Sequence, residues 1–185
     1  MKFQETKDIV LKELETILSG VKEKEIDELI ETMLQAEKIF VMGIGRVRLM
    51  SQAFAKRLVH LGLKAYVVGD ITAPPISSKD LLIAGSASGE TMATVNIAKL
   101  ARKYKAGVYA VTARPDSTLG KTVTAAIVLP GPTKLKLKGE IKTLQAMGSL
   151  FEQGLLILYD SVAMILKEKL KQSEEDLWSR HDNLE

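Results

Sequence analysis

Glycine and hydroxyl-bearing residues are concentrated in the segment Gly85–Thr91, whose sequence is Gly-Ser-Ala-Ser-Gly-Glu-Thr. An apolar run precedes it and a helical pattern follows it, so we expect a strand, a turn and the start of a helix. Small residues such as Gly89 let backbone N–H groups converge on a ligand, and the hydroxyls of Ser86, Ser88 and Thr91 can donate to phosphate oxygens. The segment therefore predicts a phosphate site. The alternative is a helix cap in which Ser88 only satisfies backbone N–H groups.

A second glycine-containing loop, Gly43–Arg48, follows an earlier apolar run. Its Gly-x-Gly is a weak sign of a dinucleotide site, because Arg48 replaces the third glycine of that fingerprint and is expected to obstruct close helix–strand packing. Asp70, near the end of the second predicted strand, keeps a nucleotide-binding alternative open. We favour Gly45 and Arg46 as substrate-binding residues, with Arg46 as a cation beside a bound anion. The alternative for Arg46 is a surface arginine.

The candidates for proton transfer are one glutamate and two histidines. Glu152 stands where a long helical pattern becomes strongly apolar, so partial desolvation would suit it as a general base. The alternative is an exposed glutamate on the polar side of that helix, and Asp160 further along is interpreted as structural. His60 is expected to end a helix. His181 lies near the C-terminus, where the pattern alone indicates a solvated side chain.

The residue types available for metal chemistry are few. Among the 185 residues there is no cysteine, which excludes disulfides and thiolate metal sites. The two histidines are too few for a multi-histidine metal centre within one chain. We therefore expect no metal and no other cofactor.

Charge and hydropathy patterns narrow the partners. The 26 Lys and Arg residues are scattered among 23 Asp and Glu residues, and only 5% of residues are aromatic, so no basic surface with stacking side chains is expected. The first twenty residues lack the pattern of a signal peptide, and no apolar run reaches membrane-spanning length. The sequence predicts a cytoplasmic protein that binds neither nucleic acid nor membrane.

The apolar pattern predicts the elements that must position these residues. Two amphipathic helices open the chain, and from residue 39 onward short, uniformly apolar runs alternate with helical patterns. Strands that are apolar at every position need both faces covered, so we expect an α/β fold: a three-layer α-β-α sandwich around a five-stranded parallel sheet. The predicted strands are Ile39–Met42, Ala65–Val68, Leu81–Ala84, Val108–Val111 and Ala125–Leu129, with helices over Leu49–Leu61 and Thr91–Tyr104.

After the last strand, we expect a mobile loop, then one long helix over Thr143–Leu170 and a polar tail over Ser173–Glu185. The centre of the long helix, Leu155–Tyr159, is apolar on all sides, which favours an oligomer interface. No domain boundary is expected. The predicted single domain covers 1–185, divided into N-terminal helices (1–37), sheet core (38–130), loop (131–142) and C-terminal helix with tail (143–185).

Ligands of doubly wound sheets bind outside the carboxyl ends of the strands. The loops after Met42, Ala84, Val111 and Leu129 are therefore the places to look for a site. Two of these loops carry the glycine and hydroxyl residues described above.

Longer stretches of the chain resemble a known family. The Gly-Ser-x-Ser-Gly-Glu-Thr loop resembles the phosphate loop of sugar isomerase (SIS) domains. Lys56–Val68, Gly148–Gln153 (Gly-Ser-Leu-Phe-Glu-Gln) and Arg180–Glu185 resemble the 6-phospho-3-hexuloisomerases within that superfamily. The resemblance runs from about residue 38 to the end. The chain departs from it at Val47–Arg48, where the family usually has Ser-Gly.

The resemblance implies interconversion of D-arabino-3-hexulose 6-phosphate and D-fructose 6-phosphate, a step of formaldehyde fixation through ribulose monophosphate or, in reverse, of pentose supply. It also implies an SIS fold and a homotetramer built from paired dimers. Because the 3-keto substrate is open-chain, no ring-opening acid is needed. One carboxylate can move the proton between C2 and C3 through a cis-enediol.

The resemblance also implies a role for each candidate. Glu152 would be the base, Arg46 would contact substrate, and His181 would enter the site of a neighbouring subunit. The phosphate would be held by the loop hydroxyls, Ser86, Ser88 and Thr91. A different class of function remains open, an SIS module that binds sugar phosphate without turnover, and it would need the hydroxyl loop but neither Glu152 nor His181. A dinucleotide-binding module is the third alternative.

Overall fold

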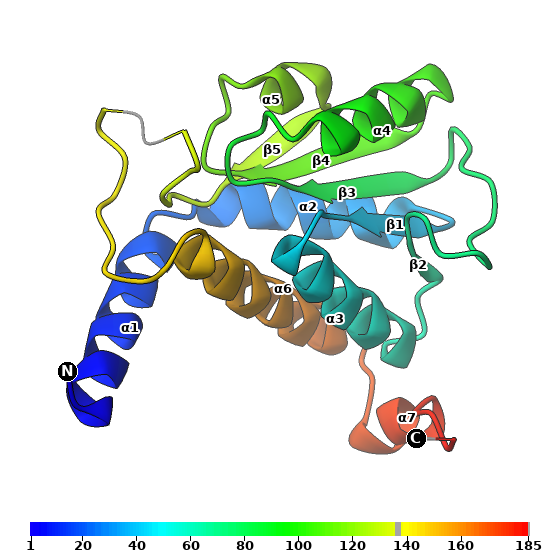
Figure 1. Ribbon diagram of the computed structural model, residues 1–185. Coiled ribbons are helices and arrows are strands. Elements are labelled where there is room, and N and C mark those ends of the chain that lie inside the picture. Colours follow the sequence, from blue (N-terminus) through cyan, green and yellow to red (C-terminus); the bar gives the residue numbers. More distant parts are fainter. Residues whose placement is uncertain (136–137, 185) are drawn as a thin grey trace.

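The computed structural model describes residues 1–135 and 138–184. Helices and strands alternate through the middle of the chain (Figure 1). The strands are β1 (Ile39–Met42), β2 (Ala65–Val67), β3 (Leu81–Gly85), β4 (Gly107–Thr112) and β5 (Ala125–Val128). The helices are α1 (Phe3–Leu18), α2 (Glu23–Gln35), α3 (Arg46–His60), α4 (Met92–Lys103), α5 (Thr118–Thr122), α6 (Ser149–Lys169) and α7 (Glu174–Ser179).

The five strands form one parallel sheet in the order β2-β1-β3-β4-β5. The first strand pairs with both β2 and β3, with Ile39 opposite Ala65 on one side and Leu81 on the other. All residues of β1 and β3 are buried, as strands covered on both faces must be. The predicted five-stranded parallel sheet is confirmed, with strand ends that differ by one residue.

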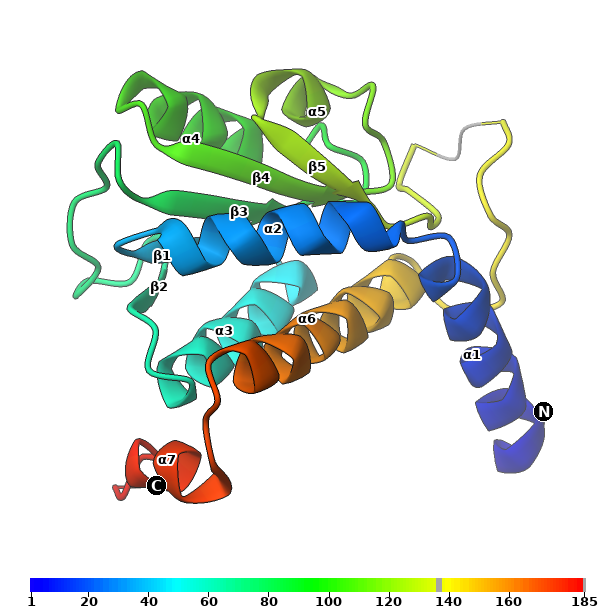
Figure 2. The same ribbon diagram turned by 180° about the vertical axis from the view of Figure 1, so that it is seen from behind.

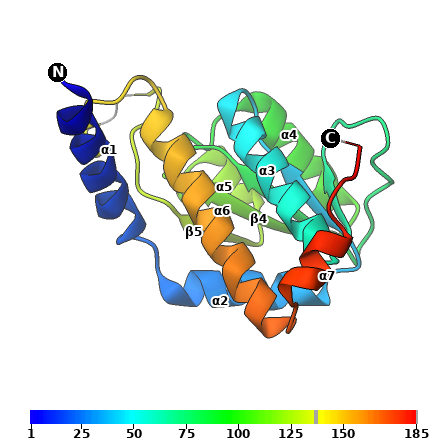
Figure 3. The same cartoon turned by 90° about the horizontal axis from the view of Figure 1, so that it is seen from below.

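Alternate side chains of each strand enter two separate cores. Val41 and Ile83 belong to the core shared with α1, α2, α3 and α6, whereas Phe40 and Leu82 belong to the core beneath α4 and α5. Figures 1 and 2 show α4 and α5 on one side of the sheet and α2, α3 and α6 on the other. The predicted three-layer sandwich is therefore confirmed, with α6 lying beside α3 (Figure 3).

The long C-terminal helix begins later than predicted. It starts at Ser149 rather than Thr143, because Met147 has a φ of +54° and interrupts helical geometry just before the cap residue Gly148. The preceding segment is bound to α1 instead: Glu13 accepts hydrogen bonds from the Thr143 hydroxyl at 2.6 Å and the Leu144 N–H at 2.9 Å. This anchor fixes the approach of the chain to α6.

The α6 helix is also apolar enough, by length and composition, to cross a membrane, which corrects the expectation that no segment is. Half of its most apolar stretch is buried against the rest of the molecule, as in a core helix of a globular domain. Within the stretch predicted to be apolar on all sides, Leu155, Leu158 and Tyr159 are buried and Ile157 is exposed.

Two short helices were not predicted. Both depend on serine caps rather than on apolar periodicity: the hydroxyl of Ser117 accepts from the Gly120 N–H before α5, and that of Ser173 accepts from the Asp176 N–H before α7. The tail therefore has a helical turn where a polar coil was expected. Within the predicted mobile loop, Lys136 and Leu137 lie outside the described residues, as does Glu185 of the tail motif.

Candidate functional site

A cavity of about 160 Å³ opens at the carboxyl ends of β1 and β3. The first turns of α3 and α6 form its other walls. It brings together six candidate residues from the sequence analysis: Gly45, Arg46, Ser86, Ser88, Thr91 and Glu152. The loop after β5 adds further lining residues, Pro132 and Lys134. The edge of the sheet at which ligands were expected is the edge where the cavity lies.

The hydroxyl loop after β3 is held in shape by its own side chains. The buried Ser86 Oγ lies 3.0 Å from Thr91 Oγ1 and accepts a hydrogen bond of 3.2 Å from the Gly89 N–H. Ser88 Oγ accepts from the Glu90 N–H at 3.2 Å. Thr91, not Ser88, is the N-cap of α4, and its side chain makes no capping bond. Three hydroxyls thus converge beside the start of α4, where the helix dipole favours an anion.

Gly89 does not line the cavity, but its conformation and close packing determine the shape of the loop. Its φ is +64°, and a Cβ atom at this position would lie 1.9 Å from Ser117 Oγ. Both the backbone conformation and the lack of space therefore require glycine here. Its carbonyl accepts a hydrogen bond of 2.9 Å from the Leu119 N–H, which ties the loop to α5.

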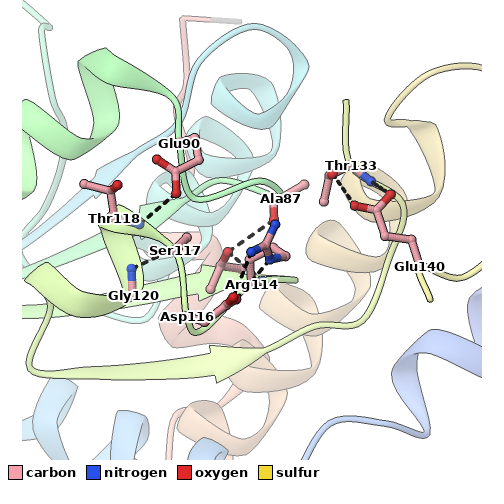
Figure 4. A network of polar contacts seen from close by, with 10 residues as sticks. Ala87, Glu90, Arg114, Asp116, Ser117, Thr118, Gly120, Thr133 and Glu140 are labelled. Carbon is pink, nitrogen blue, oxygen red and sulfur yellow. Dashed lines mark hydrogen bonds and ion pairs between the residues drawn. The ribbon is translucent and has the colours of Figure 1, made fainter. Parts of the chain in front are cut away.

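A network behind the loop connects it to the segment after β4 (Figure 4). Thr112 Oγ1 donates to the Ala87 carbonyl at 3.2 Å, and Glu90 Oε1 accepts from the Thr118 N–H at 2.9 Å. That backbone hydrogen bond lowers the pKa of Glu90 below its ordinary value. Next to it, Arg114 forms two hydrogen bonds with Asp116. The phosphate-type loop is therefore held in place by neighbouring elements before any ligand binds.

On the opposite wall of the cavity, Arg46 and Glu152 form an ion pair. Arg46 Nε lies 2.6 Å from Glu152 Oε2, although the residues are 106 positions apart in the chain. Gly45, with a φ of +62°, is the N-cap that turns the chain into α3, and Glu152 lies in the first turn of α6. The carboxylate side chain is 15% exposed and the guanidinium side chain 59%. Glu152 is thus neither fully buried nor fully exposed, and it lines the same cavity as the hydroxyl loop.

The features that kept a nucleotide site open are used within the fold. Arg48 donates to Asp70 at 2.7 Å and to the Val68 carbonyl at 3.1 Å, so the carboxylate is occupied by an arginine of this chain. The expected obstruction by Arg48 does not occur, because its side chain turns toward Asp70. Close packing of α3 depends instead on Gly43, where a Cβ would lie 2.5 Å from Val47 Cγ1.

His181 lies at the other end of α3, away from the cavity. Its ring stacks on that of buried His60, with centroids 5.3 Å apart, and contacts the ring of Trp178. His60 ends α3, as predicted, whereas Arg46 begins it. The helix rise of 1.5 Å per residue puts these ends ~20 Å apart. The structure therefore brings Arg46 and Glu152 together but does not bring His181 to them within one chain.

With respect to metals, no group of three or more Asp, Glu, His or Cys side chains suited to hold an ion occurs in residues 1–135 and 138–184. Several other cavity-lining residues were not identified as candidates from the sequence, among them Pro132, Lys134 and Phe151. The lysine-rich composition of the loop was the only available signal for Lys134, and composition cannot distinguish a lysine that faces the cavity from its neighbours.

Comparison with known proteins agrees with this geometry. Residues 32–157 match the SIS domain family. The chain belongs to the SIS family. Its relatives include the 3-hexulose-6-phosphate isomerase of Bacillus subtilis (strain 168), which is 41% identical over 95% of both chains. The 3-hexulose-6-phosphate isomerase of Mycobacterium gastri is 36% identical over 96% of this chain and 88% of the relative.

Solved SIS structures have the same architecture. A hypothetical protein of Methanococcus jannaschii, whose crystal structure infers a function of 3-hexulose-6-phosphate isomerase, superposes with a TM-score of 0.85 at 31% identity, covering 98% of this chain and 99% of that one. The Vibrio vulnificus NanR protein complexed with ManNAc-6P superposes with a TM-score of 0.79 at 24% identity, covering 95% of this chain and 66% of that one. The second likeness shows the fold alone.

Proposed function

We propose that this SIS protein interconverts D-arabino-3-hexulose 6-phosphate and D-fructose 6-phosphate. The observation that carries the proposal is the cavity that Glu152 and the hydroxyl loop both line. A phosphate held by Ser86, Ser88 and Thr91 would leave the carbon chain of the sugar near the carboxylate. Relatives named 3-hexulose-6-phosphate isomerase, matched over nearly the whole chain, give the substrate.

The chemistry follows from the substrate. It is open-chain, so Glu152 needs only to remove the proton from C2 and return it to C3, through a cis-enediol, or the reverse. The electron pair of the broken C2–H bond forms the C2=C3 bond, and the C3 carbonyl oxygen takes up a proton to give the enediol. The carbon-bound proton then returns to C3, while the C2 hydroxyl gives up its proton and the C2 carbonyl forms. Arg46, held 2.6 Å from Glu152, orients the carboxylate while contacting the sugar oxygens.

We further propose that His181 serves the sugar oxygens in the site of a neighbouring subunit. The ~20 Å length of α3 separates it from Glu152 of its own chain. A histidine suits the task because one nitrogen of a neutral imidazole can donate a proton while the other accepts one. This role requires a homo-oligomer, for which we propose the homotetramer of paired dimers.

The remaining parts of the proposal concern setting and partners. Residues 1–185 act as one SIS domain in the cytoplasm, with a small sugar phosphate and further copies of the same chain as partners. The reaction needs no metal and no other cofactor, and the protein engages neither nucleic acid nor membrane. These properties suit an enediol mechanism in which protein side chains carry out every proton transfer.

The alternative is an SIS module that binds sugar phosphate without turnover. Fold does not separate the two, because the sugar isomerase domain of an RpiR transcription factor from Sphaerobacter thermophilus superposes with a TM-score of 0.73 at 16% identity. A sensor would need the hydroxyl loop but no base. The half-buried carboxylate of Glu152 in the cavity wall favours the enzyme.

A coupled assay tests the proposal. Purified protein is supplied with the 3-hexulose phosphate, and fructose 6-phosphate is detected as it forms. We expect turnover without added metal or nucleotide, unchanged by EDTA. Binding of fructose 6-phosphate without turnover would support the sensor, and activity that returns only with a divalent metal would overturn the enediol mechanism.

A further inference from the structure

The charged side chains of the cavity wall decide how the charge of a bound phosphate would be balanced. Arg46 is already paired with Glu152 at 2.6 Å, and these two charges cancel. A sugar phosphate brings a further −1.5 to −2 at neutral pH. The hydroxyls of the loop and the start of α4 offer dipoles but no full charge to balance it. The cavity therefore needs another cation.

Among the residues that the structure describes, Lys134 is the other lysine or arginine that lines the cavity. Its side chain is exposed, and it makes no ion pair with any other residue in the described ranges. An ammonium with three donors and no protein acceptor, at the mouth of a cavity lined by hydroxyls, suits a phosphate oxygen.

The backbone on both sides of Lys134 is fixed. The neighbouring Thr133 is buried, and its N–H and hydroxyl both donate to the Glu140 carboxylate (Figure 4). The same hydroxyl accepts from the Leu135 N–H at 3.1 Å. One threonine side chain thus joins the residue before Lys134 to the residue after it. These hydrogen bonds of Thr133 therefore hold the backbone around Lys134 in place.

We propose that Lys134 is the counter-ion of the substrate phosphate and that Thr133 and Glu140 position it. The inference rests on the proposed function for the identity of the sugar, but the recognised chemistry is a phosphomonoester. The lysine would donate to phosphate oxygens that the hydroxyl loop binds from the other side. Arg46 then stays with Glu152 instead of turning to the phosphate.

The test compares Lys134→Met with Lys138→Met. Both changes remove one ammonium from the same loop, but Lys138 does not line this cavity. We expect Lys134→Met to weaken binding of fructose 6-phosphate, and competition by inorganic phosphate, by about tenfold or more, the effect of losing one hydrogen bond to a charged group. Lys138→Met should bind both as the wild type does. Turnover at saturating substrate should stay at the wild-type level in Lys138→Met.

Further variants keep the result interpretable. Thr133→Val removes the hydrogen bonds of the threonine hydroxyl but keeps the lysine. It should weaken phosphate binding less than Lys134→Met does. An unchanged affinity would refute the positioning role. Equal affinities of Lys134→Met and Lys138→Met would overturn the inference even if the wild type is an active isomerase. If the wild type lacks turnover while only Lys134→Met loses phosphate affinity, the proposed function fails and the lysine assignment stands.

Discussion

The two ends of helix α3 differ in how much of a reactive site one chain completes there. At its start, Arg46 pairs with Glu152 of α6 in a cavity that also contains the hydroxyl loop. At its end, buried His60 stacks with the exposed His181 of the tail. The second end presents an exposed histidine ~20 Å from the start of α3, which is the arrangement expected if a neighbouring subunit uses it.

The tail is nevertheless ordered by contacts at the end of α3. Arg180 Nη1 donates to the His60 carbonyl, to Gln172 Oε1 and to the Asp176 carbonyl. Lys56 lies 3.7 Å from Asp182. These contacts replace the solvated coil expected from the pattern alone. They hold His181 on its own subunit in a defined position from which a partner could use it.

The largest effect should come from the start of α3. Glu152→Gln keeps the size and hydrogen bonding of the side chain but removes its ability to accept a proton. We expect turnover to fall by about 10²- to 10⁴-fold, with binding of fructose 6-phosphate largely kept. Steady-state kinetics and calorimetry measure the two quantities, and Asp160→Asn on the exposed side of the same helix is the control. Retained turnover in Glu152→Gln would show that Glu152 is not the base.

Mixing two inactive variants tests whether the two ends of α3 act together across a subunit boundary. Glu152→Gln and His181→Ala are combined under conditions that exchange subunits. If each site takes Glu152 from one chain and His181 from another, some mixed oligomers contain an intact site and activity returns. No recovery despite demonstrated exchange would mean that the two ends of α3 do not cooperate across a subunit boundary.

A smaller effect is expected at the hydroxyl loop. Ser88→Ala removes one hydrogen bond to a charged phosphate, worth roughly 1.5–3 kcal/mol. The Michaelis constant should rise by about tenfold or more, while the unfolding temperature changes little because Ser88 is not the cap of α4. Ser173→Ala, at the cap of α7, is the matched control: it should lower stability locally and leave the Michaelis constant unchanged. If Ser88→Ala binds fructose 6-phosphate like the wild type, the hydroxyl only shapes the turn.

The smallest effect concerns pH. The folded-state pKa of Glu90 lies below its ordinary value of 4.5, because the ionised form accepts the Thr118 N–H. Its contribution to stability is therefore complete above about pH 4.5 and is lost as pH falls through the lowered pKa. Unfolding curves of wild type and Glu90→Gln should differ most near neutral pH and converge in acid. A difference between the two unfolding curves that stays constant below pH 4 would contradict this stabilising role of the Glu90 carboxylate.

The sequence predicts the frame of the site better than its contacts. The strands follow from uniform apolar runs, because burial on both faces leaves no polar position. The short α5 and α7 could not be found by periodicity, since serine caps start them. The start of α6 was misplaced because the interruption at Met147 is a backbone conformation that residue types do not reveal.

Contacts between distant residues were the least predictable. Arg46 and Glu152 were each identified as candidates, but no local pattern pairs residues 106 positions apart. The same holds for Arg48 and Asp70. The sequence suggested Asp70 as part of a nucleotide site and Arg48 as an obstruction to one, and the fold joins the two side chains to each other. Lys134 lines the cavity because of the path of the loop after β5, which the residue types do not reveal.

The central claim is that Glu152 moves a proton between C2 and C3 of a phosphosugar held by the hydroxyl loop. Solvent exchange tests it directly: fructose 6-phosphate is incubated with the protein in D₂O and the loss of its C3 proton signal is followed by NMR. We predict deuterium at C3 with wild type, none at C1, and at least a hundredfold slower exchange with Glu152→Gln. Exchange at C1, or undiminished exchange at C3 in Glu152→Gln, would contradict the account.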